Sequence, residues 1–124
     1  MDVISTSKAP AAIGPYSQAI SAGGFLFCSG QIPLDPTSGE MLCGSIEEET
    51  GQVMENLKAV LAAAGIGFEQ VVKTTIYLVS MDDFPAVNQV YGRYFSGVKP
   101  ARVTVAVAAL PRGARLEIDA VAAL

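Results

Sequence analysis

The chain has 124 residues, of which 51% are hydrophobic and 16% charged, and its formal net charge is −4. This length suits one domain, so we expect residues 1–124 to form a single domain. The eight basic residues are scattered, whereas phosphate neutralisation needs clustered Lys and Arg, so we expect no nucleic-acid partner. So few charges leave apolar surface on a small globule, which favours a homo-oligomer.

The composition also excludes several classes of catalytic site. The chain contains no histidine, which rules out His general bases, Ser-His and Cys-His nucleophiles and nearly all zinc catalysis. Its two cysteines, Cys28 and Cys43, do not form a C-x-x-C pair, and we expect both to be reduced. No apolar run reaches the length of a membrane span and the first residues do not resemble a signal peptide, so we expect a cytoplasmic protein without a membrane partner.

The N-terminal half predicts a short strand, a hairpin and a helix. Residues 3–5 suggest the short strand, and two apolar runs around Gly23-Gly24 predict the hairpin. Ser45-Ile-Glu-Glu48 matches the capping box, in which a hydroxyl and a glutamate satisfy the first backbone donors of a helix. We therefore predict a helix over 46–64, ended by Gly65.

The C-terminal half predicts a strand, a second helix and two further strands. Residues 71–79 are rich in β-branched side chains and indicate a central strand. Asp82 or Asp83 is expected to cap a helix that ends near 96–97, and strands follow at about 103–108 and 114–123. The order β-β-β-α-β-α-β-β predicts an α+β fold, a mixed sheet with both helices on one face. Apolar residues on both faces of the late strands predict that other subunits cover the second face.

Arg102 is the most informative charged residue, because it follows Pro100 at the start of an apolar strand. A guanidinium there needs a carboxylate, which either the protein or a ligand supplies. If the last two strands pair as a hairpin, Glu117 lies close to Arg102. Glu117 is then either the ion-pair partner of Arg102 or a general base that activates water.

Other polar residues are weaker candidates, since each is more often structural than functional. They are Tyr16, Ser17, Ser29 and Asn88. Gly30 would let a ligand approach the backbone. Nothing in the sequence near Cys28 activates its thiol, and we expect it to be a core residue.

Seven stretches along the whole chain resemble the reactive intermediate/imine deaminase family (Rid, or YjgF-like, also called the endoribonuclease L-PSP family). They include Gly-Pro-Tyr-Ser-Gln, Ser-Gly-Gln-Ile-Pro and Pro-Ala-Arg, and they lie at 12–19, 29–33, 56–65, 72–77, 84–91, 100–102 and 116–122. Each stretch is short, but all seven occur in the family's order. The family archetype has Ser after Pro-Ala-Arg, where this chain has Val103.

The resemblance implies a chorismate-mutase-like α+β fold of the bacillus type and a barrel-like homotrimer with ligand clefts between subunits. It implies hydrolysis of 2-imino or enamine acids, such as 2-aminoacrylate, to 2-oxo acids and ammonia, with neither cofactor nor metal. By the family's pattern Arg102 would hold the substrate carboxylate and Glu117 would position the attacking water. The further residues that match cleft positions are Tyr16, Ser29, Gly30, Asn88 and Thr104.

Two alternatives to a deaminase remain. A non-catalytic, chaperone-like trimer would bind small carboxylates in the same cleft without turning them over. An endoribonuclease or translation inhibitor is disfavoured by the acidic pI of about 4.6 and by the absence of histidine.

Overall fold

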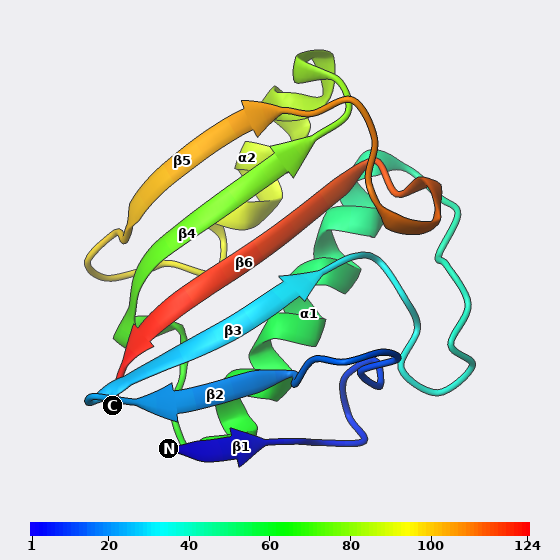
Figure 1. Cartoon of the computed structure of the whole chain (residues 1–124). Helices are drawn as coiled ribbons and strands as arrows, with labels where there is room; N and C mark the ends of the chain where they lie inside the picture. Colours follow the sequence, from blue (N-terminus) through cyan, green and yellow to red (C-terminus); the bar gives the residue numbers. More distant parts are fainter.

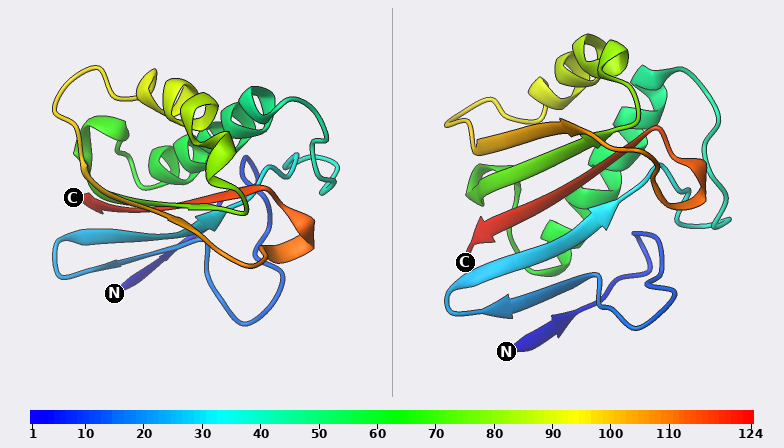
Figure 2. Two further views of the ribbon diagram at one scale, coloured as in Figure 1. Left: turned by 90° about the horizontal axis from the view of Figure 1, so that it is seen from above. Right: turned by 45° about the horizontal axis from the view of Figure 1, so that its top comes forward.

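Six strands form one mixed sheet in the order β1-β2-β3-β6-β4-β5, and two helices pack on one of its faces (Figures 1 and 2). The structure is a computed structural model and describes all of residues 1–124. The α+β class, the element order and the placement of both helices on one face are confirmed. The elements are β1 (Asp2–Ile4), β2 (Ala19–Ala22), β3 (Phe25–Gln31), α1 (Ile46–Ala63), β4 (Val71–Leu78), α2 (Phe84–Gly92), β5 (Ala101–Ala106) and β6 (Leu116–Ala123), with single 3-10 turns η1 (Phe68–Gln70), η2 (Met81–Asp83) and η3 (Pro111–Gly113).

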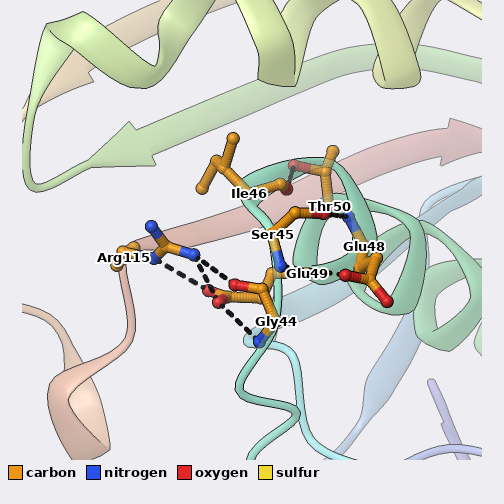
Figure 3. Close-up of polar contacts among 7 residues, drawn as sticks. All are labelled: Gly44, Ser45, Ile46, Glu48, Glu49, Thr50 and Arg115. Carbon is orange, nitrogen blue, oxygen red and sulfur yellow. Dashed lines mark hydrogen bonds and ion pairs between the residues drawn. The ribbon is translucent and has the colours of Figure 1, made fainter.

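The first helix begins at the predicted capping box (Figure 3). Ser45 Oγ accepts the backbone N–H of Glu48 at 3.0 Å, and Glu48 Oε1 accepts the N–H of Ser45 at 3.0 Å. Each bond satisfies a backbone donor that the first turn of a helix leaves free. Gly65, with φ +77°, follows the helix end in the left-handed conformation that glycine adopts without steric cost.

An ion pair joins the start of α1 to the start of β6 (Figure 3). Glu49 is 6% exposed, and its two carboxylate oxygens accept Arg115 Nε at 3.2 Å and Nη2 at 2.5 Å. Arg115 Nη2 also donates to the carbonyl of Gly44 at 2.9 Å. This fork-shaped contact fixes the chain direction just before β6 enters the sheet.

The hydrophobic core lies between the helices and the sheet. Along β6 every second side chain is fully buried on the helix side, and the residues between them are half-buried on the other face. This strict alternation is what a strand with one face on the core requires. The largest fully buried side chains come from both helices and from β3, β4 and β6, and include Leu26, Met54, Leu57, Leu61, Ile76, Val87, Leu116 and Ile118.

The predicted boundaries of the second helix and of β5 were wrong. The helix ends at Gly92, before the predicted 96–97, although Phe95 beyond it is still buried against the core. Ser80 Oγ accepts the N–H of Asp82 at 3.2 Å, whereas the side chain of Asp83 makes no capping bond. β5 starts at Ala101, so Arg102 lies within the strand.

The last two strands do not pair as a hairpin, so the condition under which Glu117 would lie close to Arg102 is not met. β4 lies between β5 and β6, pairing with β5 in parallel and with β6 in antiparallel register. A parallel pair needs a crossover, and α2 supplies it (Figure 1). Arg102 is consequently opposite Thr74, while Glu117 is opposite Tyr77.

No helix covers the second face of the sheet (Figure 2). Large apolar side chains of β3 and β5 are exposed there. Phe25 and Phe27 on β3 are 42% and 48% exposed, and Val103 and Val105 on β5 are 42% and 38% exposed. We call this surface the open face. Neither helix of the fold combines the length and apolarity needed to cross a bilayer.

Candidate active site

Arg102 lies on the edge strand β5 and reaches over α2. Its guanidinium carbon is 5.3 Å from the ring centre of Phe84 and 5.2 Å from that of Tyr91, and Nη1 donates to Asn88 Oδ1 at 2.6 Å. Residues 84, 88 and 91 share one helix face because they are spaced by four and three. We call Arg102 and these three residues the Arg102 cluster.

The Arg102 cluster holds a cation with neutral groups only. The single ion pair of the chain joins Arg115 to Glu49, so no carboxylate neutralises Arg102. Two aromatic faces and one amide oxygen orient the guanidinium, and its remaining N–H donors are free for an external carboxylate. Arg102 is exposed, which leaves these donors accessible.

The aromatic support of Arg102 is itself fixed. Tyr91 Oη and Thr74 Oγ1 lie 2.7 Å apart in a buried hydrogen bond, and Thr74 is the register partner of Arg102. Thr104 lies two residues after Arg102, so both side chains point to the same face of β5. Asn88 and Thr104 thus belong to the same side of the sheet as Arg102.

Glu117 lies in the middle of the sheet, on β6, and its side chain passes over the backbone of Gly30. A Cβ at position 30 would lie 2.0 Å from Glu117 Oε2, so no other residue leaves room for this carboxylate. The pairing of β3 with β6 changes register between Cys28 and Gln31, which is where Gly30 lies. Gly30 therefore permits a close approach of the Glu117 side chain to the backbone, while the approach of a ligand at Gly30 stays a prediction.

Glu117 opens into a cavity of about 580 Å³ at the end of the sheet where β3 leaves and β6 begins. Four residues predicted from the sequence line it: Tyr16, Ser29, Gly30 and Glu117. We call it the Glu117 cavity. Its remaining lining comes from Pro10, Ala11, Ile13, Gln18, Gln31, Ile32, Leu34, Pro111 and Arg112.

Hydrogen bonds from two polar side chains shape the wall of the Glu117 cavity. Gln18, 4% exposed, donates from Nε2 to the carbonyls of Thr6 at 3.0 Å and Pro10 at 2.8 Å, and its Oε1 accepts the N–H of Thr6 at 2.7 Å. Ser29 Oγ donates to the carbonyl of Ser17 at 2.6 Å. These bonds fold the N-terminal segment against β3 and hold Tyr16 beside the cavity.

The sequence did not single out Gln18 or Arg112 as cavity residues. A glutamine immediately before the apolar Ala19-Ile20 was the available signal for Gln18, since a polar side chain there must find buried partners. Arg112 is the one non-glycine residue with positive φ, 56°, and Nη1 donates to the carbonyl of Gly39 at 3.0 Å. The adjacent Gly113 predicted a turn here, but nothing in the sequence predicted the hydrogen bond from Arg112 to Gly39.

Burial raises the pKa of two side chains, Glu117 on β6 and Cys28 on β3. The pKa of Glu117 is raised above its usual value, first by burial and then by the negative charge of Asp119. Burial is also the main cause that raises the pKa of the Cys28 thiol to about 12. Cys28 packs in the hydrophobic core, as predicted.

Arg102 and Glu117 do not meet within one chain. Arg102 lies over α2 on the helix side of the sheet, whereas Glu117 lies between the core residues Leu116 and Ile118 and so points to the open face. The interpretation of Glu117 as the ion-pair partner of Arg102 in the same chain is therefore wrong. The Arg102 cluster and the Glu117 cavity are therefore two separate groups of residues on opposite faces of the sheet.

Known proteins resemble the chain over its full length. The sequence model of the family described as Endoribonuclease L-PSP matches residues 6–124. The 2-iminobutanoate/2-iminopropanoate deaminase of Mus musculus is 54% identical over 97% of this chain and 89% of its own length. Among solved structures, YyfA of Yersinia pestis, a member of the conserved Rid protein family, has a TM-score of 0.97 at 48% identity, covering 99% of this chain and 98% of YyfA.

TdcF of E. coli, solved with bound serine, has a TM-score of 0.95 at 37% identity, covering 100% of this chain and 99% of TdcF. The family model and the two relatives indicate the same family, and each of these matches covers nearly the whole chain. The chain belongs to the Endoribonuclease L-PSP family, the YjgF/RidA (Rid) proteins.

Proposed function

We propose that the protein is a cofactor-free hydrolase that converts 2-imino acids and their enamine tautomers, of the 2-aminoacrylate class, to 2-oxo acids and ammonia. The observation that carries this proposal is the oriented guanidinium of Arg102, which has no carboxylate partner in its own chain. The name of the mouse relative, an imine deaminase 54% identical to this chain, supports the same reaction. The serine bound to TdcF is a small amino acid with a carboxylate group, which suits an arginine anchor.

We also propose that the site forms between subunits of a homotrimer in the cytoplasm. In this proposal the Arg102 cluster and the Glu117 cavity are the two halves of one site. They lie on opposite faces of one sheet, so a second chain must bring an Arg102 cluster to each Glu117 cavity. The exposed apolar side chains of the open face support such an assembly, because their burial would stabilise it. In this arrangement every subunit contributes to two sites.

The proposed chemistry needs only an anchor, a water and a proton acceptor. Arg102 binds the carboxylate of the imino acid, and Glu117 takes a proton from water as the water oxygen attacks C2 of the C=N bond. Attack on the protonated imine gives a neutral carbinolamine. Glu117 returns its proton to the nitrogen, the C–N bond breaks to release ammonia, and Glu117 takes the hydroxyl proton as C2 becomes the carbonyl carbon of a 2-oxo acid. This last proton passes to the departing ammonia, which leaves as ammonium. An enamine enters this route after its tautomerisation to the imine.

The test is hydrolysis of an imino acid made in the cuvette from its amino acid by an amino acid oxidase. Semicarbazide traps the surviving imine, so an active deaminase lowers the rate of semicarbazone formation. Arg102→Ala should lose at least tenfold in this activity, whereas Arg93→Ala, at the exposed end of α2, should retain it. Full activity of Arg102→Ala would refute the proposed anchor.

Mixing two inactive variants tests the shared site. Arg102→Ala and Glu117→Gln should each be inactive alone, because each lacks one half-site. After dissociation and reassembly of a one-to-one mixture, about one quarter of the interfaces should combine an intact Arg102 with an intact Glu117. Recovery of about that fraction of activity supports sites between subunits, and no recovery contradicts it.

The competing function is binding of small carboxylates without turnover. Calorimetric binding of a 2-oxo acid that Arg102→Ala abolishes, together with no acceleration of imine loss at any protein concentration, would favour it. Acceleration that depends on both Arg102 and Glu117 would exclude it.

A further inference from the structure

A second carboxylate lies next to Glu117 on β6. Asp119 follows it by two residues, and side chains at i and i+2 of a strand point to the same face, about 7 Å apart. Both residues are half-buried on the open face. Neither the resemblance nor the chemistry described above uses Asp119.

Two donors on β4 fix the Asp119 carboxylate in place. Oδ1 accepts the backbone N–H of Thr75 at 3.1 Å, and Oδ2 accepts the hydroxyl of Tyr77 at 3.1 Å. The pKa of Tyr77 is raised, first by burial and then by the charge of Asp119, so its hydroxyl keeps the proton that it donates. No Lys or Arg forms an ion pair with Asp119. The cation that faces it is Lys73 on β4, which lines a small cavity together with Asp119 and Cys28.

Glu117 is the only carboxylate that lines the Glu117 cavity. The neighbouring negative charge is Asp119, two residues further along β6. Tyr77 lies opposite Glu117 on β4, and Tyr16 and Arg112 line the same cavity. From β3 only Ser29, Gly30 and Gln31 line this cavity, and none of them titrates. Arg112 donates to the carbonyl of Gly39 and forms no ion pair with Glu117.

We propose that Asp119 is a positioning residue that acts through Glu117: held by Tyr77 and Thr75, its fixed negative charge strengthens the proton affinity of Glu117. The inference rests on the proposed function for its catalytic meaning, but it also makes a claim about Glu117 alone. A stronger base takes the proton of the attacking water more readily. The same proton is then available for the departing ammonia, so no further acid is required.

Carboxyl-carbon NMR tests the inference without any substrate. Asp119→Asn should move the Glu117 titration to lower pH by about one unit, as expected for the loss of a charge at two-residue spacing in a half-buried site. Asp119→Glu keeps a charge on this face and should restore most of the shift.

The control is Glu55→Gln, which removes a carboxylate from the exposed side of α1, where it accepts the hydroxyl of Tyr94 at 2.8 Å. This variant should leave the Glu117 titration unchanged. An unchanged Glu117 titration in folded Asp119→Asn would overturn the inference. A Glu117 titration in Asp119→Glu that matches the one in Asp119→Asn would overturn it too, because the charge would then have no effect.

Kinetics separate this inference from the proposed function. The acid limb of the imine hydrolysis rate should follow the Glu117 titration, moving to lower pH by the same amount in Asp119→Asn. If the NMR titration moves while the rate profile does not, Asp119 still acts on Glu117 and the proposed role of Glu117 in hydrolysis is wrong. If neither moves, the inference itself is wrong.

Discussion

Gly30 determines whether the Glu117 carboxylate can lie over β3. We predict that Gly30→Ala displaces the Glu117 side chain, because a new Cβ would lie 2.0 Å from its Oε2. The end of a glutamate is flexible, so the fold should survive with a loss of about 1 kcal/mol or less, while imine hydrolysis should fall at least tenfold. Gly51→Ala, in α1 with no neighbour within 4 Å of the added Cβ, is the matched control and should keep full activity. Normal activity of Gly30→Ala would show that the position of Glu117 is unimportant.

Glu117 should also destabilise the fold as the pH rises. Its pKa is higher in the folded chain than the ordinary value of 4.5, so the unfolded chain loses this proton first. The stability that Glu117 contributes is therefore complete below pH 4.5 and is lost as the pH rises through the folded value. Glu117→Gln should gain stability relative to the unmodified chain between pH 4.5 and 8, measured by urea unfolding at several pH values. A difference that stays constant with pH would contradict this expectation.

The residues of the candidate site could be chosen from the sequence, but their grouping could not. Tyr16, Ser29, Gly30 and Glu117 line one cavity, while Arg102 and Asn88 are joined elsewhere by a hydrogen bond. The pattern of one chain contains no direct information about which surface of a second chain it meets. The expectation that Arg102 and Glu117 are neighbours was therefore made within one chain, where the structure separates them.

At the level of elements, the residues at the two ends of α1 were sufficient to predict where this helix begins and ends. Ser45 and Glu48 predicted its first turn and Gly65 its end, because capping depends on a few adjacent residues. The order of strands was harder to predict, since consecutive strands are often neighbours, but β3 and β4 are not, and neither are β5 and β6. The burial pattern explains the outcome: β6 has four fully buried side chains and takes a central place, while β5, mostly exposed, forms the edge.

The cap of α1 gives a stability prediction at this scale. Ser45→Ala removes the acceptor of the Glu48 N–H and should lower the free energy of unfolding by about 1 kcal/mol. Ser96→Ala, in the exposed segment after α2, makes no hydrogen bond that would be lost and should change it little. Urea unfolding measures the free energy of unfolding of both variants, and their midpoints can be compared directly if the dependence of this free energy on urea concentration is unchanged. Equal midpoints for the two variants would mean that the capping box contributes no net stability.

For the molecule as a whole, the open face should be the surface through which chains associate. Phe27→Asp places a charge among the apolar side chains of this face. If the chains form the homotrimer proposed above, this change should reduce the mass in solution from three times 12.9 kDa to that of one chain. Lys58→Asp, on the exposed side of α1, should leave the mass unchanged. Light scattering measures both, with circular dichroism to show that the variant chain remains folded. A Phe27→Asp protein that keeps the threefold mass would place the interface elsewhere.

The central position of β6 has a consequence for protein synthesis. Residues 116–123 leave the ribosome after the other five strands, yet they join β3 to β4 and so connect the two halves of the sheet. Until they emerge, β1–β3 and β4–β5 have no shared hydrogen bonds and the apolar sides of both helices lack part of their cover. The complete sheet is therefore assembled only after translation has passed β6, and the nascent chain must be kept from aggregating until then.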